Sequence, residues 1–68
     1  MRLITQVRLA AGIRSQMELA RRSNLHYATI NGAETGRLIP WPGQAQKIAT
    51  TLGWPEDRAA ELFEEVKS

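Results

Sequence analysis

Apolar residues recur with a helical period at both ends of the chain. Residues 1–11 place apolar side chains three and four positions apart, which predicts an amphipathic helix. The same spacing predicts a fourth helix over about 43–52 and a fifth helix after Pro55, with Glu56 and Asp57 at its positive end. The residues expected to face the core from these three helices are Ile4, Val7, Ala11, Ala45, Ile48, Ala49, Leu52, Ala59, Leu62, Phe63 and Val66.

The stretch between them, residues 15–36, predicts two short helices joined by a tight turn. The first would run from about 16 to 22 with Ser15 as its N-cap. Asn24 then ends that helix, because asparagine tolerates the positive φ that a short inter-helix turn requires. The second helix would run from about 26 to 34.

The second of these helices is expected to have an inner and an outer face. Ile30 and Ala33 would point inward. The outer face would carry Tyr27, Ala28, Asn31 and Gly32. The glycine would either allow the backbone to approach a ligand closely or simply weaken the helix.

In this order and spacing, the residues resemble the helix-turn-helix of the lambda-repressor-like (Cro/repressor, XRE-type) DNA-binding domains. The family pattern is roughly S-Q-x-x-L-A-x-x-x-G-V-S-x-x-x-I-S-x-x-E-x-G. The matching positions are Ser15, Gln16, Leu19, Ala20, Asn24 for Gly, Leu25 for Val, His26 for Ser, Ile30, Asn31 for Ser, Glu34 and Gly36. The resemblance continues through Pro40, residues 47–49 and 52–53, and 62–63, so it covers nearly the whole chain. It implies one all-α domain of five helices over residues 1–68, with the helix-turn-helix at about 15–36.

Composition and charge fit such a domain. The chain of 68 residues contains no cysteine, and no apolar run suggests a leader peptide or a membrane span, so we expect a cytoplasmic protein. Residues 1–37 carry six arginines against two glutamates, a net charge of +4, whereas residues 38–68 carry −2. The basic half contains the predicted helix-turn-helix, as a surface that faces phosphates would require, although chance scatter of surface charge is the alternative.

The resemblance also implies which residues would contact DNA. Base contacts would come from the second motif helix in the major groove, where Asn31 can pair with adenine and Tyr27 can donate a hydrogen bond or pack against a thymine methyl. The base-contacting set is His26, Tyr27, Ala28 and Asn31. The backbone-contacting set is Arg14, Ser15, Gln16, Thr35 and Arg37. The simpler alternative is an exposed polar surface on a small helix.

One structural contact follows from the same register. In the family, an arginine in the first helix commonly pairs with the glutamate that closes the recognition helix, and here these positions are Arg8 and Glu34. The alternative is two unrelated surface charges.

Catalytic chemistry finds no support in the sequence. His26 is the only histidine and Asp57 the only aspartate, and no glycine-rich phosphate loop is present. With no cysteine and no second histidine, we expect no metal site and no cofactor. We therefore expect a binding protein rather than an enzyme.

The expected function is sequence-specific binding of double-stranded DNA by a small bacterial or phage transcriptional regulator, and we expect it to be a repressor. The alternative is an antitoxin or a regulatory protein-interaction module on the same fold. A single recognition helix reads few base pairs, so a homodimer on a palindromic site is expected. Its interface would use Trp54, Leu62, Phe63 and Val66, unless these residues are needed to complete the monomer core. Trp41 would either cover the core or lie on the surface.

Overall fold

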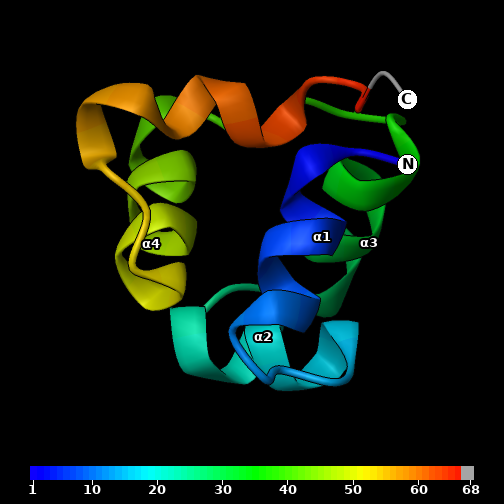
Figure 1. Cartoon of the computed structure of the whole chain (residues 1–68). Helices are drawn as coiled ribbons and strands as arrows, with labels where there is room; N and C mark the ends of the chain where they lie inside the picture. Colours follow the sequence, from blue (N-terminus) through cyan, green and yellow to red (C-terminus); the bar gives the residue numbers. More distant parts are fainter. Residues whose placement is uncertain (67–68) are drawn as a thin grey trace.

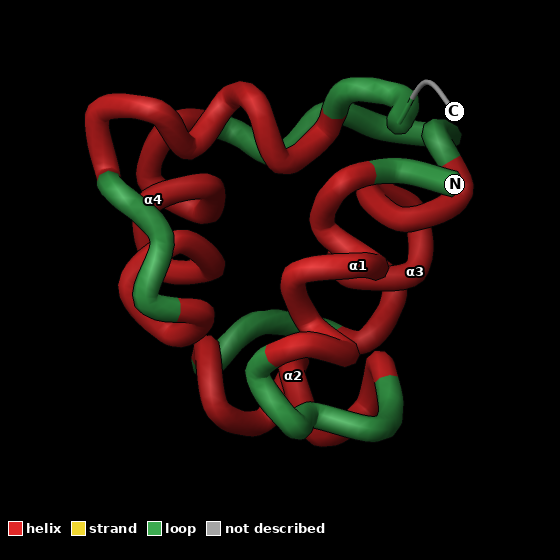
Figure 2. Tube along the Cα trace, viewed as in Figure 1, coloured by secondary structure: helices red, strands yellow, loops and turns green. Residues whose placement is uncertain are grey.

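The computed structural model describes residues 1–66 and contains five helical elements. They are α1 (Leu3–Ala10), α2 (Gln16–Ser23), α3 (Tyr27–Thr35), α4 (Pro42–Leu52) and the 3₁₀ helix η1 (Glu56–Phe63). Figure 2 shows helices and loops but no strand over these residues. Within the described residues, the one pairing of extended backbone is an isolated bridge between Arg2 and Glu65. The prediction of an all-helical chain is therefore confirmed.

The helices close into a ring around one core. In Figure 1, α2 forms the lower edge and η1 the upper edge, with α4 on the left and α1 and α3 on the right. Here α2 packs against α3 and α4, η1 packs against α4 and α1, and α1 contacts α3. Over residues 1–66, no helix has the length and apolar character needed to cross a lipid bilayer.

Local sequence signals account for the turn between α2 and α3. The Ser15 hydroxyl accepts a hydrogen bond from the Glu18 backbone N–H at 3.0 Å, so Ser15 caps α2 as predicted. Asn24 ends α2 in the left-handed region with φ of 59°. The chain then enters α3 at Tyr27, with His26 as the N-cap. Ala20 is buried, and its small side chain suits a close approach between neighbouring helices.

Buried apolar residues from all five elements form the core. The most deeply buried large side chains are Ile4, Ile13, Leu19, Ile30, Ile48 and Leu62. A domain of this size has few apolar residues to spare, so each element contributes to the same cluster.

This core removes Leu62 and Phe63 from the predicted dimer interface. Leu62 has no exposed surface and Phe63 is only 8% exposed, so neither can offer an apolar surface to a second chain. Trp54 is half-buried against the core, and its indole N–H donates to the Arg58 carbonyl oxygen at 3.1 Å. Val66 lies beyond the end of η1 and is also half-buried. Leu62, Phe63 and Trp54 therefore serve the monomer core, as the alternative interpretation held.

The fifth element differs most from its prediction. It is a 3₁₀ helix that ends at Phe63, and Arg58 has non-helical backbone angles within it. The first predicted helix is also longer than α1, which begins at Leu3 and ends at Ala10. Local periodicity marks which side of an element faces the core, but it leaves the hydrogen-bond pattern and the last turn undefined.

Candidate nucleic-acid interface

Arg8 of α1 and Glu34 of α3 form the ion pair that the sequence register predicts. Arg8 Nε lies 2.8 Å from Glu34 Oε2, and Arg8 Nη2 donates to Oε1 at 3.2 Å. Both side chains are almost fully buried, with 8% and 4% of their surface exposed. The Ile13 carbonyl oxygen accepts from Arg8 Nη1 at 3.0 Å, and the Thr5 hydroxyl donates to Glu34 Oε1 at 2.8 Å. These additional bonds compensate for the cost of burying both charges.

The ion pair continues as a chain of hydrogen bonds to the molecular surface. Gln16, the first residue of α2, donates from Nε2 to Glu34 Oε1 at 3.3 Å. Asn31 of α3 in turn donates from Nδ2 to Gln16 Oε1 at 2.9 Å. We call these four side chains, Arg8, Glu34, Gln16 and Asn31, the polar chain. It joins three helices and ends on the outer side of α3.

The polar chain uses only part of the hydrogen-bonding capacity of Asn31. One N–H of the amide donates to Gln16, which leaves the second N–H and the carbonyl oxygen for another partner. A donor and an acceptor side by side are what the edge of an adenine requires in the major groove. Gln16 also keeps one amide N–H for a neighbouring phosphate.

The other predicted base-contacting residues also lie at the surface of α3. Tyr27 is 45% exposed, and Ala28 is exposed beside it. Asn31 lies one turn further on and is half-buried because of its contact with Gln16. His26 is exposed at the start of the helix, and its imidazole makes no capping hydrogen bond. Three of these residues are exposed and the fourth, Asn31, is half-buried.

Gly32 does not belong to this surface. It is buried, and a Cβ atom at this position would lie 2.7 Å from both Cγ and Cδ2 of Leu38. The placement of Gly32 on the outer face was therefore wrong. The glycine makes room for a side chain from the loop that follows α3, and it offers no path for a ligand.

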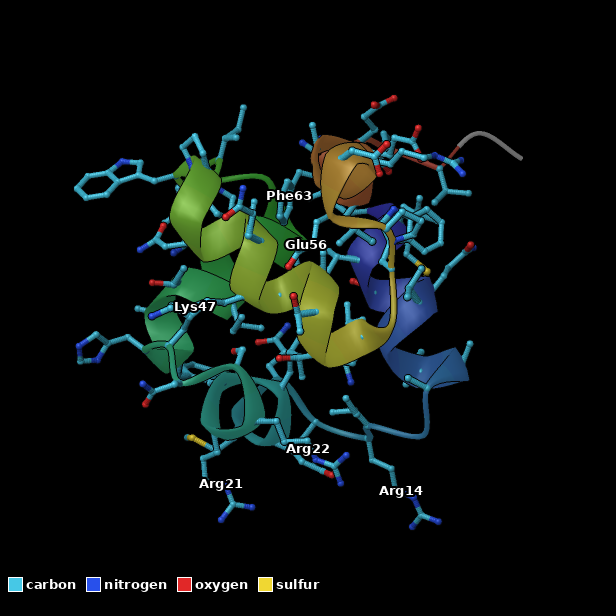
Figure 3. The ribbon with its side chains drawn as sticks, turned by 90° about the vertical axis from the view of Figure 1, so that its left-hand side faces the viewer. Arg14, Arg21, Arg22, Lys47, Glu56 and Phe63 are labelled. Carbon is cyan, nitrogen blue, oxygen red and sulfur yellow. The ribbon has the colours of Figure 1, made fainter. Side chains whose placement is uncertain are left out.

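The predicted backbone contacts divide into free and engaged groups. Arg14 and Arg37 are exposed, and Figure 3 shows Arg14 projecting into solvent near α2. The Ser15 hydroxyl is engaged in capping α2. The Thr35 hydroxyl donates to the Asn31 carbonyl oxygen of its own helix at 2.8 Å, so its proton is not directed outward to a phosphate.

The basic character of residues 1–37 is reduced by structural use of arginines. Arg8 is neutralised by Glu34 in the interior. Arg2 donates to the Phe63 carbonyl oxygen at 2.9 Å and lies 3.5 Å from Glu65. The sequence-based charge count did not separate these residues from the exposed ones. The remaining arginines of this half are exposed: Arg14, Arg21, Arg22 and Arg37.

Exposed charge is nevertheless distributed unevenly over the molecule. In Figure 3, Arg14, Arg21 and Arg22 project from the end of the molecule formed by α2, away from η1. Of these, Arg22 is paired with Glu18 at 2.6 Å. The opposite edge carries the carboxylates of η1 and the residue after it, Glu56, Asp57, Glu61 and Glu64.

The outer side of α3 therefore offers an amide, a phenol and an imidazole on a helix surface, beside the first turn of α2. Such groups can donate to phosphates, and they can donate to or accept from base edges. Comparison of the chain with protein-family models, curated proteins and solved structures found no match.

Proposed function

We propose that this protein binds double-stranded DNA sequence-specifically, as the lambda-repressor-like helix-turn-helix domain of a transcriptional regulator, most simply a repressor. In this proposal α3 enters the major groove and α2 lies across the sugar–phosphate backbone. The resemblance of residues 15–36 to that family supports it, together with the short turn at Asn24. Two copies on a palindromic site, with half-sites roughly 34 Å apart, would supply the specificity that one helix lacks.

The observation that carries the proposal is the fixed position of Asn31. Its amide is held by Gln16, which is held by Glu34, which is held by Arg8. A side chain fixed before binding loses less conformational entropy when it pairs with a base. The half-buried amide of Asn31 is thus oriented through contacts from three helices before any partner binds.

Exposed charge on the same part of the chain supports the same interpretation. Arg14 precedes α2 and Arg37 follows α3, so a cation lies in sequence beside each helix of the motif. Each phosphate that a cation neutralises releases counterions, which makes the affinity fall as salt rises. The first backbone N–H groups of α2, next to Gln16, provide further donors for a phosphate.

The decisive experiment is selection of bound sequences from random duplex DNA, followed by affinity measurements on the selected and an unrelated duplex at two salt concentrations. Asn31→Ala should weaken binding to the selected site by about 5- to 150-fold and leave the unrelated duplex almost unaffected. Arg37→Ala should weaken binding to both duplexes alike and reduce the salt slope by about one.

Gln6→Ala is the matched control, because it removes an exposed amide from α1. Its affinity should equal that of the unmodified protein. The proposal fails if no duplex is enriched, or if Asn31→Ala keeps the full preference for the selected site.

A protein-interaction role, as in an antitoxin, is the second candidate. It is favoured by Ile39 and Trp41, which leave large apolar side chains in solvent in the loop after α3. Binding to duplex DNA that weakens steeply with salt would separate the two functions, since an apolar protein contact is much less sensitive to salt.

A further inference from the structure

The side-chain amide of Asn31 is held in one orientation on α3. Its Nδ2 donates to Gln16 Oε1 at 2.9 Å, and Gln16 Nε2 donates to Glu34 Oε1 at 3.3 Å. Glu34 is in turn fixed by its buried ion pair with Arg8. The Asn31 side chain therefore cannot rotate without losing its bond to Gln16. The groups that this bond leaves for a partner, one N–H and the Oδ1 oxygen, are fixed with it.

One donor beside one acceptor matches the edge of a single base. In the major groove, adenine offers the acceptor N7 beside one N6–H donor. Guanine offers two acceptors, cytosine offers a donor, and thymine offers an acceptor and a methyl group. The Asn31 amide can therefore make two hydrogen bonds to adenine and at most one to any other base.

The N6–H that Asn31 would use is the one that a methyl group on N6 replaces. Adenine N6 carries two hydrogen atoms, and the pair with thymine requires one of them. When N6 is methylated and the base stays paired, the remaining hydrogen is kept by the pair and the methyl group turns toward N7. The groove edge then has no N6 donor, and the methyl group occupies the space in which Asn31 Oδ1 would bind.

We propose that this protein discriminates against N6-methyladenine, so that methylation of the adenine paired with Asn31 weakens its binding to DNA, a property that rests on the proposed function. A freely rotating asparagine could turn away from the methyl group at little cost. Here the turn would also break the bond to Gln16 and leave the half-buried amide with fewer partners. The polar chain therefore makes Asn31 a reader of the chemical state of adenine.

The test compares chemical forms of the selected duplex. The relevant adenine is the one whose replacement weakens binding of the unmodified protein but not of Asn31→Ala. Duplexes carry N6-methyladenine at this position, or 7-deazaadenine, which lacks the N7 acceptor. A third duplex carries N6-methyladenine outside the selected site as a control. Fluorescence anisotropy at one salt concentration gives each dissociation constant.

Methylation at the contacted adenine should raise the dissociation constant by about 5- to 150-fold, the range for losing a two-bond contact to a base. The 7-deaza form should raise it by a smaller factor, because one bond and the shape of the edge remain. Methylation outside the selected site should leave it unchanged.

Three variants relate this discrimination to the polar chain. Asn31→Ala should bind the methylated and unmethylated duplexes equally. Gln16→Met should bring the ratio of the two dissociation constants toward one, because Asn31 is then free to rotate; a lost phosphate contact of Gln16 would affect both duplexes alike and leave the ratio unaltered. Gln6→Ala, which changes an exposed amide of α1, should keep the full ratio. Circular dichroism verifies that each variant is folded.

The proposal is overturned if the selected site has no adenine that depends on Asn31, or if Asn31→Ala or Gln16→Met keeps the full discrimination. Tighter binding of the methylated duplex would also overturn it, because the methyl group would then pack against a side chain such as Ala28 or Tyr27. Equal affinities of the unmodified protein for both duplexes refute this inference alone, since the sequence preference remains. Absence of any enriched duplex refutes the proposed function and this inference together.

Discussion

Two helix junctions in this molecule are held by opposite kinds of interaction. Where α1, α2 and α3 meet, the polar chain of Arg8, Glu34, Gln16 and Asn31 makes directional hydrogen bonds. Where α4 meets η1, the buried contact is made by apolar side chains such as Ile48, Ala59 and Leu62, and the one directional bond that the described residues make there, from the Thr50 hydroxyl to Glu56 Oε1 at 2.7 Å, is exposed. Both junctions are buried, but only the first fixes the rotation of its helices about their own axes.

The difference explains why helix geometry is regular at one junction and irregular at the other. Hydrogen bonds and a bidentate ion pair lose strength steeply with angle and distance, so α3 has to sit in one orientation relative to α2. Apolar contact is non-directional, and η1 can fill its site as a 3₁₀ helix with a break at Arg58. The helix that is precisely oriented, α3, is also the helix that carries the surface that we propose for base recognition.

The largest expected effect comes from breaking the polar chain at its buried end. Glu34→Ala leaves the Arg8 guanidinium buried without its partner and should lower the free energy of unfolding by about 3–5 kcal/mol. A chain of this length has a total of roughly 3–10 kcal/mol, so much of the variant should be unfolded. Urea denaturation followed by circular dichroism measures the change.

A double variant separates the cost of an unpaired charge from the value of the ion pair itself. Arg8→Met with Glu34→Leu fills the site with apolar groups and should recover most of the lost stability. If the double variant does not recover this stability, the hydrogen bonds to Thr5, Gln16 and the Ile13 carbonyl hold the three helices together.

At the apolar junction, truncation should cost a similar amount for a different reason. Leu62→Ala leaves a cavity beneath η1 and should lower the unfolding free energy by about 2–5 kcal/mol. Leu62→Met conserves volume and should cost less than about 1.5 kcal/mol. Equal losses for both variants in urea denaturation would show that the shape of leucine is required, and the contrast between the two junctions would be lost.

A smaller effect is expected where Leu38 covers Gly32. Alanine at position 32 gains about 1 kcal/mol of helix propensity but would place its Cβ 2.7 Å from the leucine side chain. Gly32→Ala should therefore stabilise the protein clearly only when Leu38→Ala is also present. A double-mutant cycle by thermal denaturation measures this coupling, and additive effects would contradict the contact.

The smallest effect is expected at the surface ion pair of Arg22 and Glu18. Its charged atoms lie 2.6 Å apart, as close as those of the buried pair. More than half of the Arg22 side chain is exposed, so Arg22→Ala should change the unfolding free energy by less than about 0.5 kcal/mol. A loss comparable with that of Glu34→Ala would remove the distinction between buried and exposed ion pairs in this fold.

Sequence reasoning succeeded where the signal comes from neighbouring residues or from the spacing of the family that the chain resembles. Ser15 and Asn24 are recognisable because capping and a positive φ depend on a few neighbouring residues. Arg8 and Glu34 are far apart in sequence, and they were paired through the spacing of the resembling family. The helical class followed from apolar periodicity at the two ends of the chain, from the cap and turn residues between them and from the family resemblance.

Residues whose roles depend on tertiary partners were predicted less well. The helical period places Gly32 on the outer face of α3, but the Leu38 side chain, from the loop that follows α3, covers it. Leu62 and Phe63 were assigned to an interface because periodicity cannot tell which apolar surface the core consumes. Thr5 gave no signal, since its bond to Glu34 exists only after α1 and α3 meet.

The bridge between Arg2 and Glu65 has a consequence for the order in which the protein opens. The Leu3 N–H donates to the Glu64 carbonyl oxygen at 3.0 Å, and the Val66 N–H donates to that of Met1 at 2.8 Å. These bonds tie together the two ends of the described chain beyond the apolar contact between α1 and η1, so the ends can separate at small energetic cost while that contact is kept. In amide hydrogen exchange, the Leu3 and Val66 protons should exchange well before that of Leu25, whose N–H is bound to the Ala20 carbonyl oxygen at 2.9 Å inside the α2–α3 turn.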